Sequence, residues 1–313
     1  MKRFIIFFIT TALVLSLSSC KTIAPPPEPV PEPQPVVITT PQPVSEGFVF
    51  TKENMPVIDG STATIPLIEA VYSVLLGIPR TEATEIVYTS GTDNAYDKLI
   101  WEGADILLVY SPSPETLESA ANIGIELEMA PIGRDGLVFL VNTVNPVKSL
   151  TTEQLVSIYS GKSDNWKEFG GADAEIKAYQ RPYRSGSQTM MDELVMKGVP
   201  MADTETEMVV EMMGGLIEAV AEFDNSQSAI GYNVYYFVSQ MEMNENVRML
   251  AVNGVEPTTE SISDSSYPFI SDFYAVIRQD TPADSPARVL YNWIQSAQGQ
   301  DLVRHEGYAT AGK

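Results

Sequence analysis

The sequence predicts an α/β fold, because short apolar runs alternate with amphipathic helical patterns from about residue 57 onward. Unbroken apolar runs at 106–110 and 136–142 are typical of strands that are buried on both faces. Between such runs, apolar residues recur at helical spacing, as they do at 66–76 and 287–296. The chain has 313 residues, enough for two ordinary domains, so a sizeable buried core is expected.

The individual elements are predicted from the same patterns. Strands are expected at 85–88, 106–110, 136–142, 176–180, 229–233, 247–252 and 273–278. Helices are expected at 66–76, 94–102, 151–159, 189–197 and 287–296. Asp135-Gly136 is interpreted as a turn, and Thr151 or Thr152 as an N-cap. The methionines, Met208, Met212 and Met213 among them, are expected to pack in the core.

The charge balance limits the possible partners. Lys and Arg number 19 against 41 Asp and Glu, which gives a formal net charge of -22. Such a surface repels nucleic acid and anionic membranes, although the acidity can also be no more than a well-solvated surface. Any anion that binds must therefore be held by local donors against an unfavourable overall field.

The first twenty residues resemble a lipoprotein signal. Lys2 and Arg3 precede an apolar stretch at 4–17, and Leu17-Ser18-Ser19 then leads to Cys20. We expect residues 1–20 to be the signal peptide, with Cys20 as the lipidated residue; the alternative is an ordinary secretory signal with an incidental thiol. Because Cys20 is the only cysteine, no internal disulfide is possible.

Residues 21–47 are predicted to be a proline-rich linker. Nine prolines lie between residues 24 and 44, and proline favours an extended, semi-rigid backbone, although plain disorder is the alternative. The folded part is expected to begin near Phe48.

Three turns rich in hydroxyl side chains join a predicted strand to a predicted helix, at 59–66, 89–94 and 181–189. A helix start exposes unpaired backbone N–H groups, and hydroxyls add neutral donors, so such turns suit an anion. The third turn also carries Arg181, whose guanidinium can bond an oxyanion through two N–H groups. Taken singly, each turn can instead be a capping cluster or a solvated loop; taken together, they predict one binding site.

The sequence argues against an enzyme. The single histidine, His305, lies near the C-terminus, so any Ser–His arrangement would depend on a tail residue. There is no Cys/His cluster for zinc, no calcium loop and no Gly-Lys-Ser/Thr phosphate motif. No metal or cofactor is expected.

An ordered set of segments resembles the substrate-binding proteins of phosphate-specific ABC importers, in the periplasmic binding protein superfamily. The resemblance covers nearly all of the chain after the linker, and it is carried by residues 59–66, 155–166, 181–189, 229–232, 251–258, 267–269 and 299–308. It implies a two-lobe periplasmic-binding-protein fold of type II. Each lobe is then a mixed sheet flanked by helices, and two crossover strands join the lobes. Lobe 1 would comprise 48–135 plus 270–313, and lobe 2 would comprise 136–269.

The resemblance also implies ligand-binding residues. In the first turn these are Thr64 and the amide of Ile65, assisted by Ser61 and Thr62. In the third turn, Arg181, Ser185, Gly186 and Ser187 match the family's Arg-x-x-x-Ser-Gly-Ser/Thr anion loop. From the second turn, Ser90 or Thr92 is the expected contributor.

One position departs from the family pattern. The family places an aspartate after the strand ending at Val109, where it accepts the proton of hydrogen phosphate, and this chain has Tyr110 there. A carboxylate repels a fully ionised oxyanion and so supports discrimination for a protonated one. Asp93 or the phenol oxygen of Tyr110 are the alternative acceptors.

These inferences predict an exported, lipid-anchored solute-binding protein that faces the periplasm or the cell exterior. It would capture an inorganic oxyanion, first of all phosphate, in a cleft between the lobes, as a monomer that serves an ABC importer permease. The alternatives are a different oxyanion, a small phosphorylated or acidic ligand, or a sensor or adhesion lipoprotein on the same fold.

Overall fold

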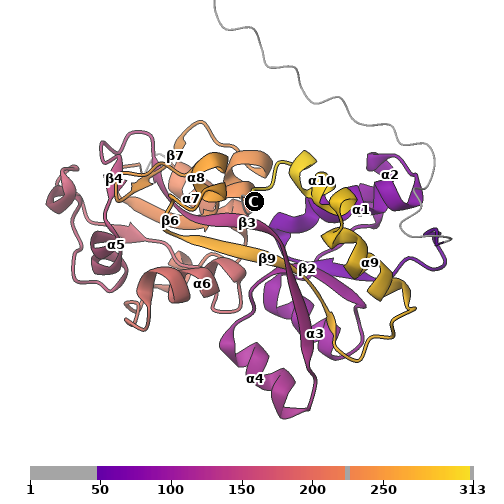
Figure 1. The fold of residues 1–313 in the computed structure, drawn as a ribbon. Coiled ribbons are helices and arrows are strands. Elements are labelled where there is room, and N and C mark those ends of the chain that lie inside the picture. The colour runs from indigo at the N-terminus through magenta and orange to yellow at the C-terminus, as the bar shows by residue number, and fades with distance from the viewer. Residues whose placement is uncertain (1–47, 223–225, 311–313) are drawn as a thin grey trace, which may run out of the picture. The chain divides into compact units, whose positions relative to one another are not determined.

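The computed structural model describes residues 48–222 and 226–310. The predicted signal peptide, Cys20 and the proline-rich linker lie outside the described residues. Within them, helices and strands alternate along the chain (Figure 1), which confirms the predicted α/β class.

A seven-stranded mixed sheet organises the folded part. Its order is β1 (Ile58–Gly60), β2 (Ile106–Tyr110), β9 (Ile270–Arg278), β3 (Leu127–Asn142), β6 (Ala229–Val234) and β5 (Lys177–Ala178), and β7 (Val247–Met249) also pairs with β3. The outer pairs β1–β2 and β5–β6 are parallel, whereas β2–β9, β9–β3 and β3–β6 are antiparallel. A separate parallel pair is formed by β4 (Ser149–Leu150) and β8 (Ala251–Val252).

Strand β3 changes partners at its middle. Its residues from Leu127 to Gly136 pair with β9, and those from Leu137 to Val141 pair with β6. Figure 1 shows β3 as a long magenta strand that leaves β2 and β9 and continues beside β6. One continuous strand therefore belongs to both halves of the sheet.

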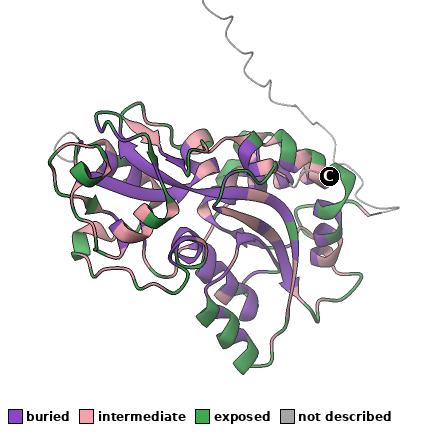
Figure 2. Cartoon of the chain, turned by 60° about the vertical axis from the view of Figure 1, so that its left-hand side comes forward, coloured by how far each residue is buried: buried purple, intermediate pink, exposed green. Residues whose placement is uncertain are grey.

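Ten α-helices surround these strands in the described residues. They are α1 (Ile65–Leu76), α2 (Arg80–Ile86), α3 (Thr92–Ile100), α4 (Pro114–Asn122), α5 (Thr152–Tyr159), α6 (Gly186–Met190), α7 (Met213–Ala221), α8 (Thr259–Ser263), α9 (Pro286–Gln295) and α10 (Ala297–His305). A π-helical segment, Met191–Met196, continues α6, and a 3-10 turn, Thr62–Thr64, precedes α1. Figure 2 shows that the strands are largely buried, whereas the outer surfaces of helices are exposed.

Local sequence explains where several helices begin and end. The Thr151 hydroxyl accepts the Gln154 amide at 3.2 Å, and the Gln154 side chain accepts the Thr151 amide at 2.8 Å. This capping box satisfies two backbone donors at the start of α5, which agrees with the predicted N-cap. Helix α1 has Pro66 in its first turn and ends at Gly77, whose φ of 64° is accessible to glycine at little cost.

The apolar residues form one large buried cluster and a smaller one. Phe139, Tyr159 and Tyr232 pack together in the large cluster, with ring centroids between 5.4 and 6.4 Å apart. The smaller cluster packs Tyr96 and Leu99 of α3 against β2 and β9. At about 25 cal/mol for each Å² of apolar area buried, these contacts provide the main stabilisation of the two halves.

Three predictions about local structure are wrong. Residues 85–86 end helix α2 rather than begin a strand, because the segment from Arg80 is rich in helix-favouring residues and starts after Pro79. Asp135-Gly136 lies inside β3 and forms no turn, since the Asp135 carboxylate accepts the amides of Gly136 and Tyr236. Met212 is 74% exposed rather than packed in the core.

Candidate functional site

The three hydroxyl-rich turns meet at one cavity of about 300 Å³. Its lining consists of Ser61, Thr62, Ala63, Thr89, Ser90, Gly91, Thr92, Asn94, Tyr110, Arg181, Pro182, Arg184, Ser185, Gly186, Ser187, Glu211, Met213 and Val234. The predicted convergence of the turns is therefore confirmed. Eight of the ten predicted ligand-binding residues line the cavity; Thr64 and Ile65 do not.

In the first turn, the cavity is lined by Ser61, Thr62 and Ala63. The next two residues, Thr64 and Ile65, do not line it. The Thr64 hydroxyl donates to the carbonyls of Ser61 and Leu108, at 2.8 and 2.6 Å, and the Ile65 amide donates to the Thr62 carbonyl. The placement of Thr64 and Ile65 thus differs from the prediction, because their donors serve the backbone of the turn itself.

Ser61 is joined to the second turn through its hydroxyl. Ser61 Oγ accepts the Tyr110 amide at 3.2 Å and lies 2.8 Å from Thr92 Oγ1. Only one of these two hydroxyls donates to the other, so the pair retains one hydroxyl proton that it does not use. Both side chains line the cavity, and that proton is available to a ligand there.

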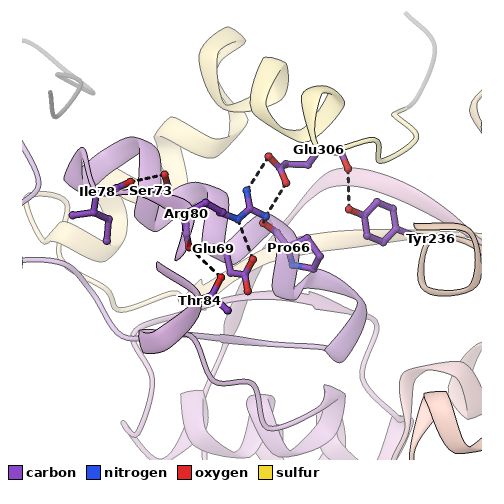
Figure 3. Close-up of polar contacts among 8 residues, drawn as sticks. All are labelled: Pro66, Glu69, Ser73, Ile78, Arg80, Thr84, Tyr236 and Glu306. Carbon is purple, nitrogen blue, oxygen red and sulfur yellow. Dashed lines mark hydrogen bonds and ion pairs between the residues drawn. The ribbon is translucent and has the colours of Figure 1, made fainter. Parts of the chain in front are cut away.

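The first turn is supported from behind by the C-terminal segment. The Tyr308 hydroxyl donates to the Ala63 carbonyl at 2.8 Å, and the Tyr308 ring stacks on Tyr236 with centroids 3.7 Å apart. Figure 3 shows Arg80 between Glu69 and Glu306, with a further bond to the Pro66 carbonyl, and the Tyr236 hydroxyl bonded to the Glu306 carbonyl at 2.8 Å. These contacts hold the start of α1 against α2 and against the segment that follows α10. Through Tyr236, they also join that segment to the residues that follow β6.

The second turn is held by Asp59, whose side chain is buried. Asp59 accepts the Ser90 amide at 2.7 Å and the Ser90 hydroxyl at 2.6 Å, and it lies 3.2 Å from Lys98 Nζ. The Ser90 hydroxyl therefore donates its proton to Asp59, although Ser90 lines the cavity. Gly91, with a φ of 83°, then lets the chain turn into α3.

Arg181 supplies a buried positive charge from the third turn. It is 7% exposed, its Nε donates to Ser187 Oγ at 3.3 Å, and its Nη1 donates to the Val210 carbonyl. None of the ion pairs among the described residues includes Arg181. Burial lowers the pKa of its guanidinium to about 10, which leaves the group charged at neutral pH.

Tyr110 does not offer an acceptor to the cavity. Its hydroxyl donates to Asp135 Oδ2 at 2.6 Å, so the phenol points into the interior. Asp93 is fully buried, and its Oδ1 accepts the Ser113 amide at 2.9 Å; it is not part of the lining. Neither residue suggested as an alternative proton acceptor therefore presents a carboxylate or phenol oxygen at the cavity wall.

The sequence missed several residues of the lining, most notably Glu211, Met213 and Val234. Among the residues that the structure describes, Glu211 is the only carboxylate of the lining, against two guanidinium groups, Arg181 and Arg184. Arg184 was within reach of sequence reasoning, because it stands in the same turn as Arg181. The other three lie between the third turn and the end of β6, and no motif marks them.

The described parts of the chain contain neither a metal-binding cluster nor a single membrane-spanning helix. In residues 48–222 and 226–310, no group of three or more His, Cys, Asp or Glu side chains could hold a metal ion. Over the same ranges, no single helix has the length and apolar character needed to cross a bilayer. Only the bent pair Thr62–Leu76 and Arg80–Ile86 meets that test when both are counted together.

Comparison with known sequences identifies the family. Residues 57–298 match the model of the PBP superfamily domain. Phosphate-binding protein PstS of Borreliella burgdorferi is 27% identical over 179 residues, which cover 56% of this chain and 62% of the relative, so the match spans less than two thirds of that protein. The protein of the same name from Bacillus subtilis is 23% identical over 80% of this chain and 79% of its own length.

Solved structures share the fold. A putative phosphate ABC transporter substrate-binding protein from Clostridium perfringens, with bound phosphate, superposes with a TM-score of 0.60 at 23% identity, over 82% of this chain and 99% of its own. An ABC-type phosphate transport receptor from Vibrio cholerae gives a TM-score of 0.58 at 25% identity, over 81% and 98%. The predicted two-lobe α/β fold and the family resemblance are thereby confirmed: the chain belongs to the PBP superfamily.

Proposed function

We propose that this protein is an exported solute-binding protein that captures an inorganic oxyanion, phosphate first of all, and delivers it to an ABC importer. The observation that carries the proposal is Arg181, a buried guanidinium at the cavity that pairs with no carboxylate among the described residues. Glu211 of the same lining favours the charged guanidinium from beyond ion-pair distance, and an oxyanion would add the direct partner that a buried cation needs. Two of the related proteins are named as phosphate-binding proteins, and a similar solved structure contains bound phosphate. Both facts agree with this chemistry.

The donors around Arg181 suit an oxyanion of tetrahedral shape. We propose that Arg181 and Ser187 bind from one side, and that Thr62 and the Ser61–Thr92 hydroxyl pair bind from the other. The Gly186 backbone lies in the same wall of the cavity. These groups replace the water shell of the anion and, Arg181 apart, carry no charge that must be desolvated. Local donors of this kind offset the repulsion expected from a net charge of -22.

The proposed mechanism is capture by closure of two lobes. Lobe 1 would be residues 48–135 plus 270–313, and lobe 2 would be residues 136–269. In support, β3 exchanges its partner β9 for β6 after Gly136, at the proposed boundary. The chain then returns to the first half of the sheet at Ile270, where β9 begins. Bending at these two crossings would open the cavity and release the ligand.

A second ligand class is favoured by two observations. The cavity of about 300 Å³ lies in the range typical of sites for small organic ligands. The one acidic group that the described residues contribute to the lining is Glu211, rather than an aspartate at position 110. A small phosphorylated compound, with its phosphate on Arg181 and its remainder toward Met213 and Val234, is therefore the alternative ligand.

The remaining parts of the proposal rest on the sequence. Lipidation at Cys20 would anchor the protein to a membrane, and residues 21–47 would form the spacer. The permease of an ABC importer would be the protein partner, and the protein would act as a monomer without cofactor or enzymatic activity. A sensor or adhesion lipoprotein would share the fold without transport.

Isothermal titration calorimetry distinguishes these ligands. The protein is titrated with phosphate, arsenate, sulfate and glycerol 3-phosphate under identical conditions. Binding of phosphate and arsenate, with weaker glycerol 3-phosphate, supports the inorganic oxyanion; the reverse order supports the phosphorylated compound. Absence of heat with all four, together with unchanged thermal stability, would refute an anion-binding function.

A further inference from the structure

Arg184, next to the serine–glycine turn of the site, is joined to helix α3. Its Nη2 lies 2.6 Å from Asp97 Oδ2, and its Nε lies 3.9 Å from Asp93 Oδ2. Arg184 lies in the loop between β5 and α6, and β5 pairs with β6. Helix α3, in contrast, packs on β2 in the other half of the sheet. These ion pairs therefore connect segments from the two sides of the partner change in β3.

The contact with Asp93 involves two buried atoms that lack hydrogen bonds. Asp93 Oδ2 and Arg184 Nε are both buried, and neither has a hydrogen-bond partner among the described residues. The other oxygen of Asp93 is already bonded to the Ser113 amide. The guanidinium of Arg184 is the cation paired with this carboxylate, and without it a fully buried charge would remain uncompensated.

The two ion pairs differ in how much each contributes to stability. Arg184 and Asp97 have side chains 39% and 40% exposed, and exposed pairs contribute little to stability. Asp93 has a side chain that is 0% exposed, so its interaction with Arg184 is weakly screened by solvent. Separation of the two segments would admit water to Asp93, so Arg184 matters most while the segments are together.

The backbone beside Arg184 is in close contact with the same helix. A Cβ atom at Gly186 would lie 2.6 Å from Thr92 Oγ1 and 3.3 Å from Tyr110 Cβ. The turn at 184–186 and the start of α3 therefore touch directly at the cavity wall. Arg184, which also lines the cavity, joins the same two segments through its ion pairs with Asp93 and Asp97.

We propose that Arg184 is a positioning residue for ligand retention. By pairing with Asp93 and Asp97, it holds the third turn against α3 across the cavity and so sets the rate at which a captured anion leaves. This inference rests on the proposed anion-binding function. It assigns to Arg184 a role that acts through α3, whereas Arg181 is the residue that meets the ligand.

The kinetics of phosphate exchange test the proposal. Radiolabelled phosphate is bound to the full exported chain, and its release is followed after addition of excess unlabelled phosphate. In Arg184→Gln, release should accelerate by about fivefold or more while the association rate changes by less than about twofold, because loss of a buried pair affects mainly dissociation. Asp97→Asn should accelerate release less, since Asp97 is exposed.

Arg304→Gln is the matched control. Arg304 is a partly exposed arginine that pairs with Asp301 within α10, and neither residue lines the cavity. This variant should leave both rates unchanged. If Arg184→Gln instead lowers the association rate as much as it raises the release rate, Arg184 acts by attracting or contacting the anion, and the positioning role is wrong. Unchanged release would also overturn it.

Hydrogen exchange without ligand separates this inference from the proposed function. In Arg184→Gln, peptides that cover 90–97 and 183–189 should exchange faster than in the wild type, because the contact between the segments opens more often. Arg304→Gln should show no such change. If the wild type fails to bind phosphate but these peptides respond, the proposed ligand is wrong and the contact role stands. If the peptides do not respond, the contact role is wrong.

Discussion

Tyr110 and Asp135 are joined by a hydrogen bond of 2.6 Å between the phenol and Oδ2, in a fully buried position. Asp135 Oδ1 also accepts the Gly136 amide at 2.8 Å and the Tyr236 amide at 3.0 Å. One carboxylate therefore ties together the end of β2 at the cavity, the middle of β3 and the segment after β6. This junction lies one residue before the position at which β3 changes partners.

The junction predicts an unusual pH dependence of stability. Burial raises the pKa of Asp135 from 3.8 to about 6, although its hydrogen bonds oppose the shift. The folded protein thus binds this proton more tightly than the unfolded chain. The contribution of Asp135 to stability is therefore present below about pH 4 and is lost as the pH rises to about 6.

Asp135→Asn should remove this dependence. The free energy of unfolding of the wild type, relative to the variant, should fall between pH 4 and pH 7 by an amount of the order of 3 kcal/mol. Urea unfolding of both proteins at several pH values measures the difference. Asp264→Asn is the control, because Ser266 lowers the pKa of the exposed Asp264 and the relative slope should be small and of opposite sign. A difference that does not vary with pH would contradict the assignment.

Arg181→Ala should weaken anion binding by about 2–5 kcal/mol, the range found when one member of a buried charge pair is truncated. Without ligand, the variant should be at least as stable as the wild type, because the burial of the Arg181 cation outweighs the attraction of Glu211, which forms no ion pair with it among the described residues. Calorimetry with phosphate and thermal melts with and without phosphate measure the two effects.

Arg288→Ala provides the comparison for Arg181. Arg288 is also largely buried, but it pairs with Glu128 at 2.6 Å and lies outside the lining. The Arg288→Ala variant should therefore be less stable than the wild type and keep its affinity for phosphate. Equal phosphate affinity of the wild type and Arg181→Ala would remove Arg181 from the binding site.

The sequence predicted those parts of the fold in which local pattern and tertiary environment agree. β2 and α1 were found because an unbroken apolar run and a one-sided helix each suit their buried positions. The first half of β3 was missed, since Pro131 and Gly133 are typical of turns; the strand accommodates them by a shift in register between these residues. Asp135-Gly136 was predicted to be a turn for the same reason. The Asp135 carboxylate accepts the amide of Tyr236, which lies 101 residues away in the sequence.

The site was predictable to the extent that its residues stand in turns between strands and helices. Arg181 and Gly186 carry such a signal, and so do the hydroxyls of the first two turns. The choice among hydroxyls was not predictable, because it depends on distant partners. Thr64 bonds to the Leu108 carbonyl and Ser90 bonds to Asp59, and only the folded chain brings these groups together.

Gly186→Ala should weaken ligand binding by disturbing the contact between the third turn and α3. The new methyl group would lie 2.6 Å from Thr92 Oγ1, closer than real Cβ contacts allow, so the turn must move away from the cavity wall. Calorimetry should show a loss of phosphate affinity of at least about 1 kcal/mol, as is usual for overpacking. Gly214→Ala, whose methyl group would meet only Glu242 at 3.9 Å, should retain full affinity. Full affinity of Gly186→Ala would show that the two segments need not touch when ligand is bound.

Ser90 and Thr92 should differ in their contributions, although both hydroxyls line the same cavity. The Ser90 hydroxyl donates to Asp59, whereas Thr92 shares an unused hydroxyl proton with Ser61. Thr92→Val should therefore reduce phosphate affinity by about 1.5–3 kcal/mol, the value of a hydrogen bond to a charged group. Ser90→Ala should mainly lower the free energy of unfolding, because Asp59 loses a buried donor. Calorimetry and urea unfolding of both variants measure the two effects, and the opposite pattern would assign the ligand donor of this turn to Ser90.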